Sequence, residues 1–315
     1  MYDNPNRYEE EFELVATSGG ARRRDTTDWP TVAVAVAAYG GWLAATRWHA
    51  LLPAPVLVVL GGWLVAWHGS LQHETIHGRP TRRLWLNTLI GGWPLALWLP
   101  YGRYRQMHLA HHRCGDVTCP QVDPESRYLP RETAASRPQV ALARLQSTLT
   151  GRLAAGPIVE VGGFLITEAK LLWRGDQAAR TAWLQHAAAA APVLVWLHAC
   201  KLDLVAYLLC FVAPGAALTL LRSYAEHRAH ADPRRRAAVV EEAPVLGLLF
   251  LNNNLHALHH AKPELSWWRL PAAYRQQRGA ILEANGGLVY RGYGDVLARY
   301  WRKPHDVLIH PGLRP

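Results

Sequence analysis

The sequence predicts an all-α integral membrane fold with four transmembrane helices in two hairpins, together with interfacial helices and a helical, histidine-rich cap. Three observations lead to this prediction. Apolar segments long enough to span a bilayer occur in two pairs, and a very short turn joins the members of each pair. Histidines gather in clusters that repeat one helical spacing near the ends of these segments. Basic residues gather on the same side as the clusters.

The composition of the chain fits a membrane protein with a large polar part. Half of the 315 residues are apolar, yet the mean hydropathy is only −0.07, which predicts a few membrane helices under a sizeable cap. The net charge of +10 suits anionic lipid or an acidic protein partner, and we expect no nucleic acid ligand. The four cysteines show no disulfide framework and no CxxC motif, so we expect them to be reduced or inert.

The first hairpin follows a polar N-terminal arm, residues 1–28, which we expect on the cytoplasmic side. Residues 29–48 and 51–71 are each about 20 residues long, enough to cross a hydrocarbon layer of about 30 Å. The link between them is short and contains Pro53 and Pro55. A buried helical hairpin of a soluble protein is the alternative, but the same pattern recurs later in the chain.

The middle of the chain predicts elements that lie at the membrane surface. Residues 84–99 are apolar but too short to span, which favours a re-entrant or interfacial helix. Residues 151–174 mix apolar residues with Glu160, Glu168 and Lys170, which indicates an amphipathic helix lying on the membrane.

The second hairpin is predicted at residues 181–200 and 202–221, with Lys201 in its turn. Residues 29–315 then form a single membrane domain whose cap comprises residues 72–180 and 222–315. The far-side turns carry Lys201, with Arg47 nearby, while nearly all other basic residues lie on the histidine side. The positive-inside rule therefore places the histidines in the cytoplasm. The Ala, Arg, Gly and Trp bias is typical of a GC-rich bacterial genome, so we expect the bacterial inner membrane.

Three clusters hold eight of the sixteen histidines. In two clusters the histidines stand at positions i, i+3 and i+4, which share one face of a helix; the third is an i, i+4 pair. Imidazoles crowded this closely repel one another when protonated, and metal coordination removes that problem. Eight imidazoles exceed the needs of one ion, so the pattern predicts two. The clusters are His73 and His77, then His108, His111 and His112, and finally His256, His259 and His260.

The identity of the metal separates three hypotheses. The stretch from His73 to His77 matches the HExxH signature of zinc peptidases, in which Glu74 would be the general base. That hypothesis leaves the other two clusters without a role. An all-imidazole site for two ions favours iron, which can activate O2. A membrane protein that binds metal without catalysis is the third hypothesis.

The order of these features resembles the integral-membrane fatty acid desaturase and hydroxylase superfamily. A hairpin, HxxxH, HxxHH, a second hairpin and HxxHH follow one another over about residues 29–270. Arg113 followed by Asp123-Pro124-Glu125, and the Asn run before His256, are similar to bacterial desaturase-like members. His227, just after the last span, matches the place where the superfamily often supplies a ninth histidine.

This resemblance implies a function. It implies two non-haem iron ions on the nine histidines, with O2 as co-substrate, and desaturation of a fatty acyl or other lipid chain by removal of hydrogen from unactivated carbons. Hydroxylation or ketolation of a lipid or carotenoid is the alternative outcome at the same site. An external donor such as a ferredoxin would supply electrons, and a carrier protein or CoA could carry the acyl group. Glu74, Asp123, Glu226 and Asn253 are candidates to orient the ligand rings.

Two departures argue against an acyl-CoA substrate of the animal type. The first cluster has three residues between its histidines, where many acyl-CoA desaturases have four. Ser223 also stands where those enzymes place an Asn, four residues before the ninth histidine.

Overall fold

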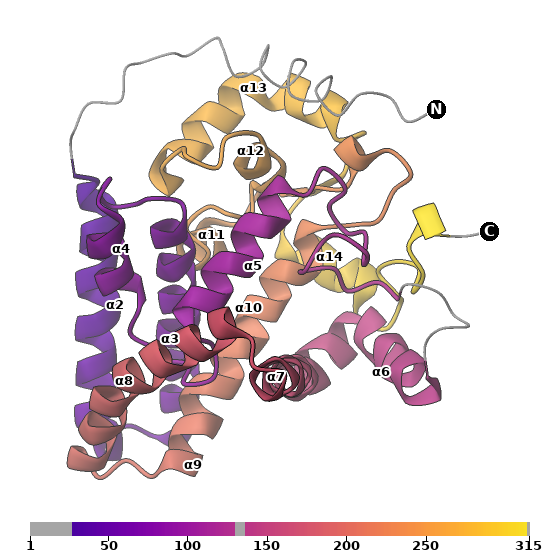
Figure 1. Cartoon of the computed structure of the whole chain (residues 1–315). Coiled ribbons are helices and arrows are strands. Elements are labelled where there is room, and N and C mark those ends of the chain that lie inside the picture. The colour runs from indigo at the N-terminus through magenta and orange to yellow at the C-terminus, as the bar shows by residue number, and fades with distance from the viewer. Residues whose placement is uncertain (1–26, 130–135, 314–315) are drawn as a thin grey trace.

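The computed structural model describes residues 27–129 and 136–313, and this part of the chain is mostly helical (Figure 1). The predicted N-terminal arm therefore lies almost entirely outside the described residues. Two short parallel strands, β1 (Val239–Val240) and β2 (Val289–Tyr290), pair with Val239 opposite Val289. The helices are α2 (Trp29–Arg47), α3 (Ala54–Ile76), α4 (Leu84–Gly91), α5 (Tyr101–Arg113), α6 (Arg137–Ser147), α7 (Leu149–Trp173), α8 (Gln177–Ala199), α9 (Leu204–Tyr207), α10 (Ala213–Glu226), α11 (Pro244–Leu249), α12 (His256–Ala261), α13 (Leu270–Ala284) and α14 (Tyr293–Tyr300).

Helices occupy all four segments that were predicted as spans. The first hairpin is α2 and α3, and the second is α8 followed by α9, the π-helical segment Leu208–Val212 and α10. Asp203 caps the start of α9 by accepting a hydrogen bond from the Ala206 N–H at 3.0 Å. Among the described helices, three are long and apolar enough to cross a membrane: Ala54–Ile76, Leu149–Trp173 and Leu204–Glu226. α2 and α8 have the length but not that composition.

α7 combines the composition of a span with a crosswise position. Figure 1 looks along its axis, whereas α2 and α3 run in the plane of the page. α7 packs against α10, α6 and α8, and so crosses beneath the cap instead of running alongside the first hairpin. Hydropathy alone does not determine this direction, which follows from the helices it packs against.

The segment predicted as one re-entrant or interfacial helix over residues 84–99 is helical only as far as Gly91. The chain then turns back through an irregular stretch to Pro100, where α5 begins. Two backbone carbonyls of this stretch are paired by side chains of the second hairpin. The Tyr207 hydroxyl donates to the Leu95 carbonyl at 2.6 Å, and His186 donates to the Leu97 carbonyl at 2.9 Å. These bonds stabilise buried backbone that has no helical partners.

The two hairpins meet where α3 and α10 pack closely. A Cβ added at Gly215 would lie 2.8 Å from the Val65 side chain, and one added at Gly62 would lie 2.8 Å from Pro214. These distances are shorter than van der Waals contact, so only glycine allows the two backbones to approach this closely. The close approach brings the C-terminal ends of α3 and α10 together.

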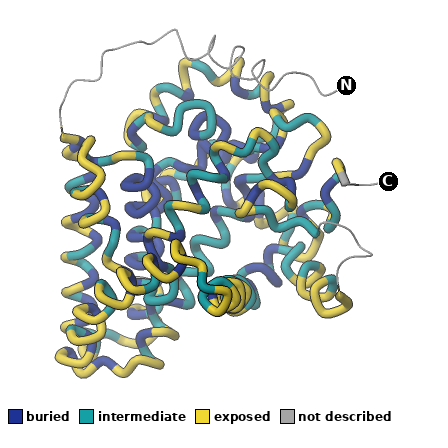
Figure 2. The backbone as a smooth tube through the Cα atoms, in the orientation of Figure 1, coloured by how far each residue is buried: buried dark blue, intermediate teal, exposed yellow. Residues whose placement is uncertain are grey.

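Buried residues concentrate where the ends of α3, α5, α10 and α12 meet, as the dark blue segments in Figure 2 show. The outward faces of the hairpins instead expose large apolar side chains. Val36, Val59 and Val195 are 69%, 72% and 67% exposed. Apolar exposure on this scale is typical of a surface that contacts lipid.

We expect Gly215→Val to destabilise the protein, because the added side chain overlaps Val65 on α3. Overpacking of this kind costs about 1–3 kcal/mol, which would lower the midpoint of thermal unfolding of the solubilised protein by several degrees. Gly40→Val is the matched control, because an added Cβ there meets nothing within 4 Å. Equal unfolding midpoints for the two variants would contradict the close α3–α10 contact.

Candidate metal centre

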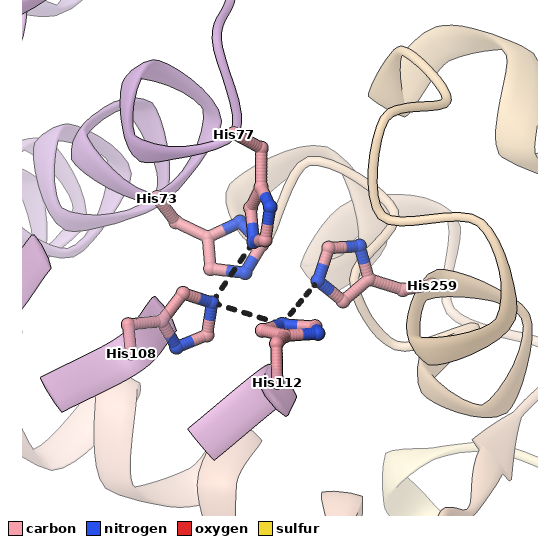
Figure 3. Close-up of side chains that lie close together, drawn as sticks. All are labelled: His73, His77, His108, His112 and His259. Carbon is pink, nitrogen blue, oxygen red and sulfur yellow. Dashed lines mark hydrogen bonds between the residues drawn. The ribbon is translucent and has the colours of Figure 1, made fainter. Parts of the chain in front are cut away.

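The nine candidate histidines converge at one end of the bundle and form two groups. Within each group, one donor atom per residue lies within 4.8 Å of the others. Figure 3 shows the first group, with rings from three separate segments pointing toward one another. The first group is His73, His77, His108, His112 and His259, and the second group is His111, His227, His256 and His260.

Each i, i+3, i+4 cluster divides its histidines between the two groups. On α5, His108 and His112 enter the first group, while His111 enters the second. On α12 the arrangement is reversed: His256 and His260 enter the second group. His259 enters the first. The two helices therefore give each group one i, i+4 pair and a single ring from the opposite helix, and His73 and His77 add a second such pair to the first group.

The Asn run before α12 fixes the position of this short helix. Asn252 has a positive φ of 56°, a conformation that Asn tolerates better than most residues. Its amide donates to the Trp267 carbonyl at 3.1 Å, and the amide of Asn254 donates to the Val240 carbonyl at 2.7 Å. These contacts attach the start of α12 to β1 and to the loop before α13.

Acceptors outside the two groups hold the other ring nitrogen of several histidines. The Nδ1 atom of His111 lies 2.8 Å from Asp123, and that of His108 lies 3.1 Å from Glu125. The Nδ1 of His227 lies 3.2 Å from the Arg236 carbonyl. An ionised carboxylate or a carbonyl can only accept, which assigns the proton to Nδ1 in each ring. When these rings are neutral, their Nε2 lone pairs therefore point into the groups.

The Nε2 atoms lie as close together as ligands of a common ion. His108 Nε2 is 3.0 Å from His77 Nε2 and 3.1 Å from His112 Nε2 in the first group. In the second group, His256 Nε2 is 2.8 Å from His227 Nε2 and 3.1 Å from His260 Nε2. Nitrogen donors about 2.0–2.1 Å from the ion would be about 2.8–3.0 Å apart around an octahedral ion and about 3.3–3.4 Å apart around a tetrahedral one.

His73 provides a further sign that the first group is built around a cation. Its Nε2 atom is buried and has no hydrogen-bond partner within the described part of the chain. Buried polar atoms rarely stay unpaired. The donor set of each group thus fits a transition metal ion.

Burial keeps most of these imidazoles in the neutral form that binds metal. Burial, followed by repulsion from His108, lowers the pKa of His77 to about 3. Burial also holds the pKa values of His256, His259 and His260 well below the usual range. For His111, burial lowers the pKa, but the hydrogen bond to Asp123 and the nearby carboxylates raise it overall.

The comparison with known families agrees with this geometry. A family model described as fatty acid desaturase matches residues 46–293, which is most of the chain and contains all nine histidines. The chain belongs to the fatty acid desaturase family. A search of curated proteins finds no significant match. The resemblance that the histidine pattern predicts is thus confirmed, and the two histidine groups lie within the desaturase domain.

In this desaturase-family protein, the residues predicted to orient the rings all lie beside them. Asp123 is hydrogen-bonded to His111, as described above. The Nδ1 atom of His256 lies 3.2 Å from the side-chain amide oxygen of Asn253 and 3.4 Å from a Glu226 carboxylate oxygen. Asn253 also donates to Glu226 at 3.0 Å. Glu74 lies 3.6 Å from His73 Nδ1. Their role as orienting residues stays a prediction.

The sequence analysis missed two partners of the histidines, Glu125 and the Arg236 carbonyl. Glu125 stands two residues after Asp123, and its backbone N–H donates to the Asp123 carboxylate at 2.9 Å. One turn therefore places both carboxylates beside α5. The Asp-Pro-Glu sequence could have indicated Glu125 as a partner together with Asp123. No local sequence signal could have indicated the backbone carbonyl of Arg236.

Cys114 and Asp123 also lie near His111. Cys114, however, donates to the His111 carbonyl at 3.1 Å and so belongs to the turn that ends α5.

Glu74 does not stand where a zinc peptidase needs its general base. The ring atom that it approaches is His73 Nδ1, whereas the buried His73 nitrogen that has no hydrogen-bond partner in the described part of the chain is Nε2. Glu74 is buried, and the Trp267 backbone donates a hydrogen bond to it. A carboxylate in this position can orient His73 but does not face a substrate at the Nε2 side.

We expect the metal-free protein to lose stability as the pH falls below about 6.5. The pKa values of His77 and His259 are lowered on folding, so the unfolded chain binds protons that the folded chain does not. Stability is then fully present above the unfolded pKa of about 6.5 and is lost on acidification. Thermal unfolding at pH 7.5 and 5.5, after chelation, measures the effect. A higher unfolding midpoint at pH 5.5 than at pH 7.5 would refute the assignment of neutral rings.

Proposed function

We propose that this protein is an O2-dependent di-iron oxidoreductase that desaturates a fatty acyl chain in a membrane. The observation that carries the proposal is the division of nine histidines into two groups beside a largely apolar cavity. We propose the first and second groups as the ligands of one iron ion each, because an all-imidazole set suits iron as well as zinc. The iron pair, when bound, would supply the activation of O2.

An apolar cavity of about 630 Å³ provides room for the chain, and we call it the acyl cavity. It lies between α3, α5, α7 and α10. Glu125 belongs to its wall and also accepts from His108, so this carboxylate connects the acyl cavity to the first group. Tyr104 lines it too, with its ring centroid 5.8 Å from that of His108. Its apolar wall includes Val65, Leu99, Met107, Phe164, Val212 and Phe250.

The protein's own contribution would be to fix the chain and to exclude water. An aliphatic chain in the acyl cavity has few directions to lie in, which positions particular carbons beside the histidines. The apolar wall removes water from those carbons. Glu125, Asp123 and Glu226 would hold the rings in the tautomer that directs Nε2 inward.

We further propose that α2, α3, α8 and the α9–α10 helix cross the bacterial inner membrane, with α7 at its cytoplasmic surface. The crosswise direction of α7 and the exposed apolar side chains of the hairpins support this arrangement. The histidines would then face the cytoplasm. An acidic electron donor such as a ferredoxin could dock on the basic cap, and the acyl group could arrive free or on a carrier protein or CoA.

The first test measures metal, oxygen and product together. The purified protein should contain iron and, with a reductant and lipid extract, consume O2 and yield a product that lacks two hydrogens. His256→Ala should remove iron from the second group and abolish O2 uptake, whereas Glu74→Gln should retain partial activity. A product that gains one oxygen atom would identify a hydroxylase. Zinc without iron, with activity lost in Glu74→Gln and kept in His256→Ala, would refute the oxygenase proposal.

We expect Glu125→Gln to weaken iron binding. The change removes the charge that favours the Nδ1–H form of His108, and loss of such a partner typically lowers metal affinity about 10–100-fold. Titration of the iron-loaded protein with a chelator measures the difference. Glu283→Gln, which removes the same charge from an exposed position on α13, is the control. Equal iron retention in both variants would show that Glu125 does not orient His108.

A further inference from the structure

We propose that the acyl cavity contains a hydroxyl-binding subsite, formed by His68 on α3 and Thr219 on α10. The proposal rests on the function proposed above, because it describes a further part of the same substrate. It narrows the substrate class to long-chain lipids that carry a hydroxyl group on the chain, away from the carbons that react. His68 precedes His73 by five residues, which is about 7.5 Å along α3 toward the membrane-spanning part of the hairpin.

His68 is a buried histidine whose ring proton can be placed from its neighbours. The residue is 1% exposed, and its Nε2 atom lies 3.1 Å from the Tyr39 hydroxyl on α2. The Tyr39 hydroxyl has a single proton, which it donates to the Ile90 carbonyl, a group that can only accept. Tyr39 therefore accepts from His68, which assigns the ring proton to Nε2. In the neutral ring, Nδ1 then carries a lone pair and can act only as an acceptor.

This Nδ1 acceptor has no partner within the protein. Among the described residues no hydrogen bond reaches it, and it does not belong to the polar atoms that are fully enclosed. The surface that it retains faces the acyl cavity, because His68 lines this cavity whereas Tyr39 and Ile90 do not. Buried polar atoms rarely stay unpaired, and an ionisable side chain within a membrane helix typically marks a functional site. The bond to Tyr39 accounts for only one of the two ring nitrogens.

Gly69 leaves space beside this acceptor. At Gly62, an added Cβ would lie 2.8 Å from Pro214, so helix packing explains the earlier glycine. At Gly69, the nearest contact of an added Cβ outside its own stretch of helix is the Thr219 hydroxyl oxygen, at 4.0 Å. Glycine weakens a helix relative to alanine, yet no contact here excludes a methyl group. Gly69 and Thr219 both line the acyl cavity, so the space between them is open to a ligand.

The polarity of the subsite selects an alcohol. Thr219 donates its own proton to the Gly215 carbonyl at 3.1 Å, which leaves its oxygen as a second acceptor. A substrate hydroxyl would donate to His68 Nδ1, and its oxygen could accept from Thr219 when that hydroxyl rotates. A ketone has no proton to offer Nδ1, and a methylene group leaves both acceptors unpaired. A chain bound through its hydroxyl would also present a fixed set of carbons to the first histidine group.

Equilibrium binding tests the subsite independently of turnover. We would titrate the full-length protein, in nanodiscs of uncharged lipid and with and without iron, with octadecanoate and with octadecanoates that carry one hydroxyl or one keto group at carbon 10, 12, 14 or 16. Burying a hydroxyl without a partner costs free energy, so a hydroxyl that misses His68 should weaken binding. At one position the hydroxyl acid should instead bind about tenfold more tightly than octadecanoate, whereas the matching keto acid should not.

Matched variants locate the effect. Gly69→Ala should remove the preference for the hydroxyl acid, because its methyl group fills the space beside His68. Gly163→Ala adds the same methyl group elsewhere on the cavity wall, where it meets nothing within 4 Å, and should keep the preference. Thr219→Val retains the side-chain shape and should reduce the preference. His68→Phe should abolish it; if that variant does not fold, Gly69→Ala still tests the subsite, because it leaves the bond between His68 and Tyr39 in place.

Three results would overturn the inference: no hydroxyl position that improves on octadecanoate, a keto acid that binds as tightly as the hydroxyl acid, or an equal loss of preference in Gly69→Ala and Gly163→Ala. The subsite and the proposed function fail separately. Iron and O2 uptake without a hydroxyl preference would refute the subsite alone. A hydroxyl preference that depends on Gly69, in a protein without iron or O2 uptake, would refute the proposed function alone.

Discussion

The rest of the structure depends on one constraint, the convergence of neutral imidazole lone pairs at the buried end of the helical bundle. Hydrogen bonds from Nδ1 to Asp123, Glu125 and the Arg236 carbonyl direct the Nε2 lone pair of each neutral ring into its group. Lone pairs about 3 Å apart repel unless a cation lies between them, and burial excludes the water that could otherwise separate them. The fold must therefore hold these rings rigidly against that repulsion. A metal ion between the lone pairs would remove the repulsion itself.

Rigidity comes from packing that only small or special residues permit. Gly62 and Gly215 let α3 and α10 approach closely enough to bring their histidine-bearing ends together. Asn252, in a left-handed conformation, redirects the chain so that α12 can begin at His256. Neither feature touches a candidate metal ion. Both determine whether rings from segments more than a hundred residues apart can meet.

Local sequence patterns were sufficient to predict the helices of the two hairpins and the histidine clusters, but tertiary contacts decided the rest. The i, i+3, i+4 spacing places three rings on one face of a helix, and it says nothing about which rings share a group. The division between His108 and His111 follows from how α5 meets α12. The crosswise direction of α7 and the break after Gly91 depend in the same way on neighbours that are distant in sequence. Glu125 was within reach of a sequence argument, because it follows Asp123 in the same turn.

The irregular stretch between α4 and α5 also shapes the acyl cavity. Ala96, Trp98 and Leu99 belong to its wall, and they lie in the irregular stretch that Tyr207 and His186 stabilise. Trp98 meets Phe164 of α7 edge to face, with ring centroids 5.5 Å apart, while Arg103 and Glu168 form a buried ion pair at 2.8 Å between α5 and α7. A regular helix over this stretch would not turn back, and its side chains would point elsewhere. The shape of the acyl cavity thus depends on hydrogen bonds from the second hairpin to two backbone carbonyls, those of Leu95 and Leu97.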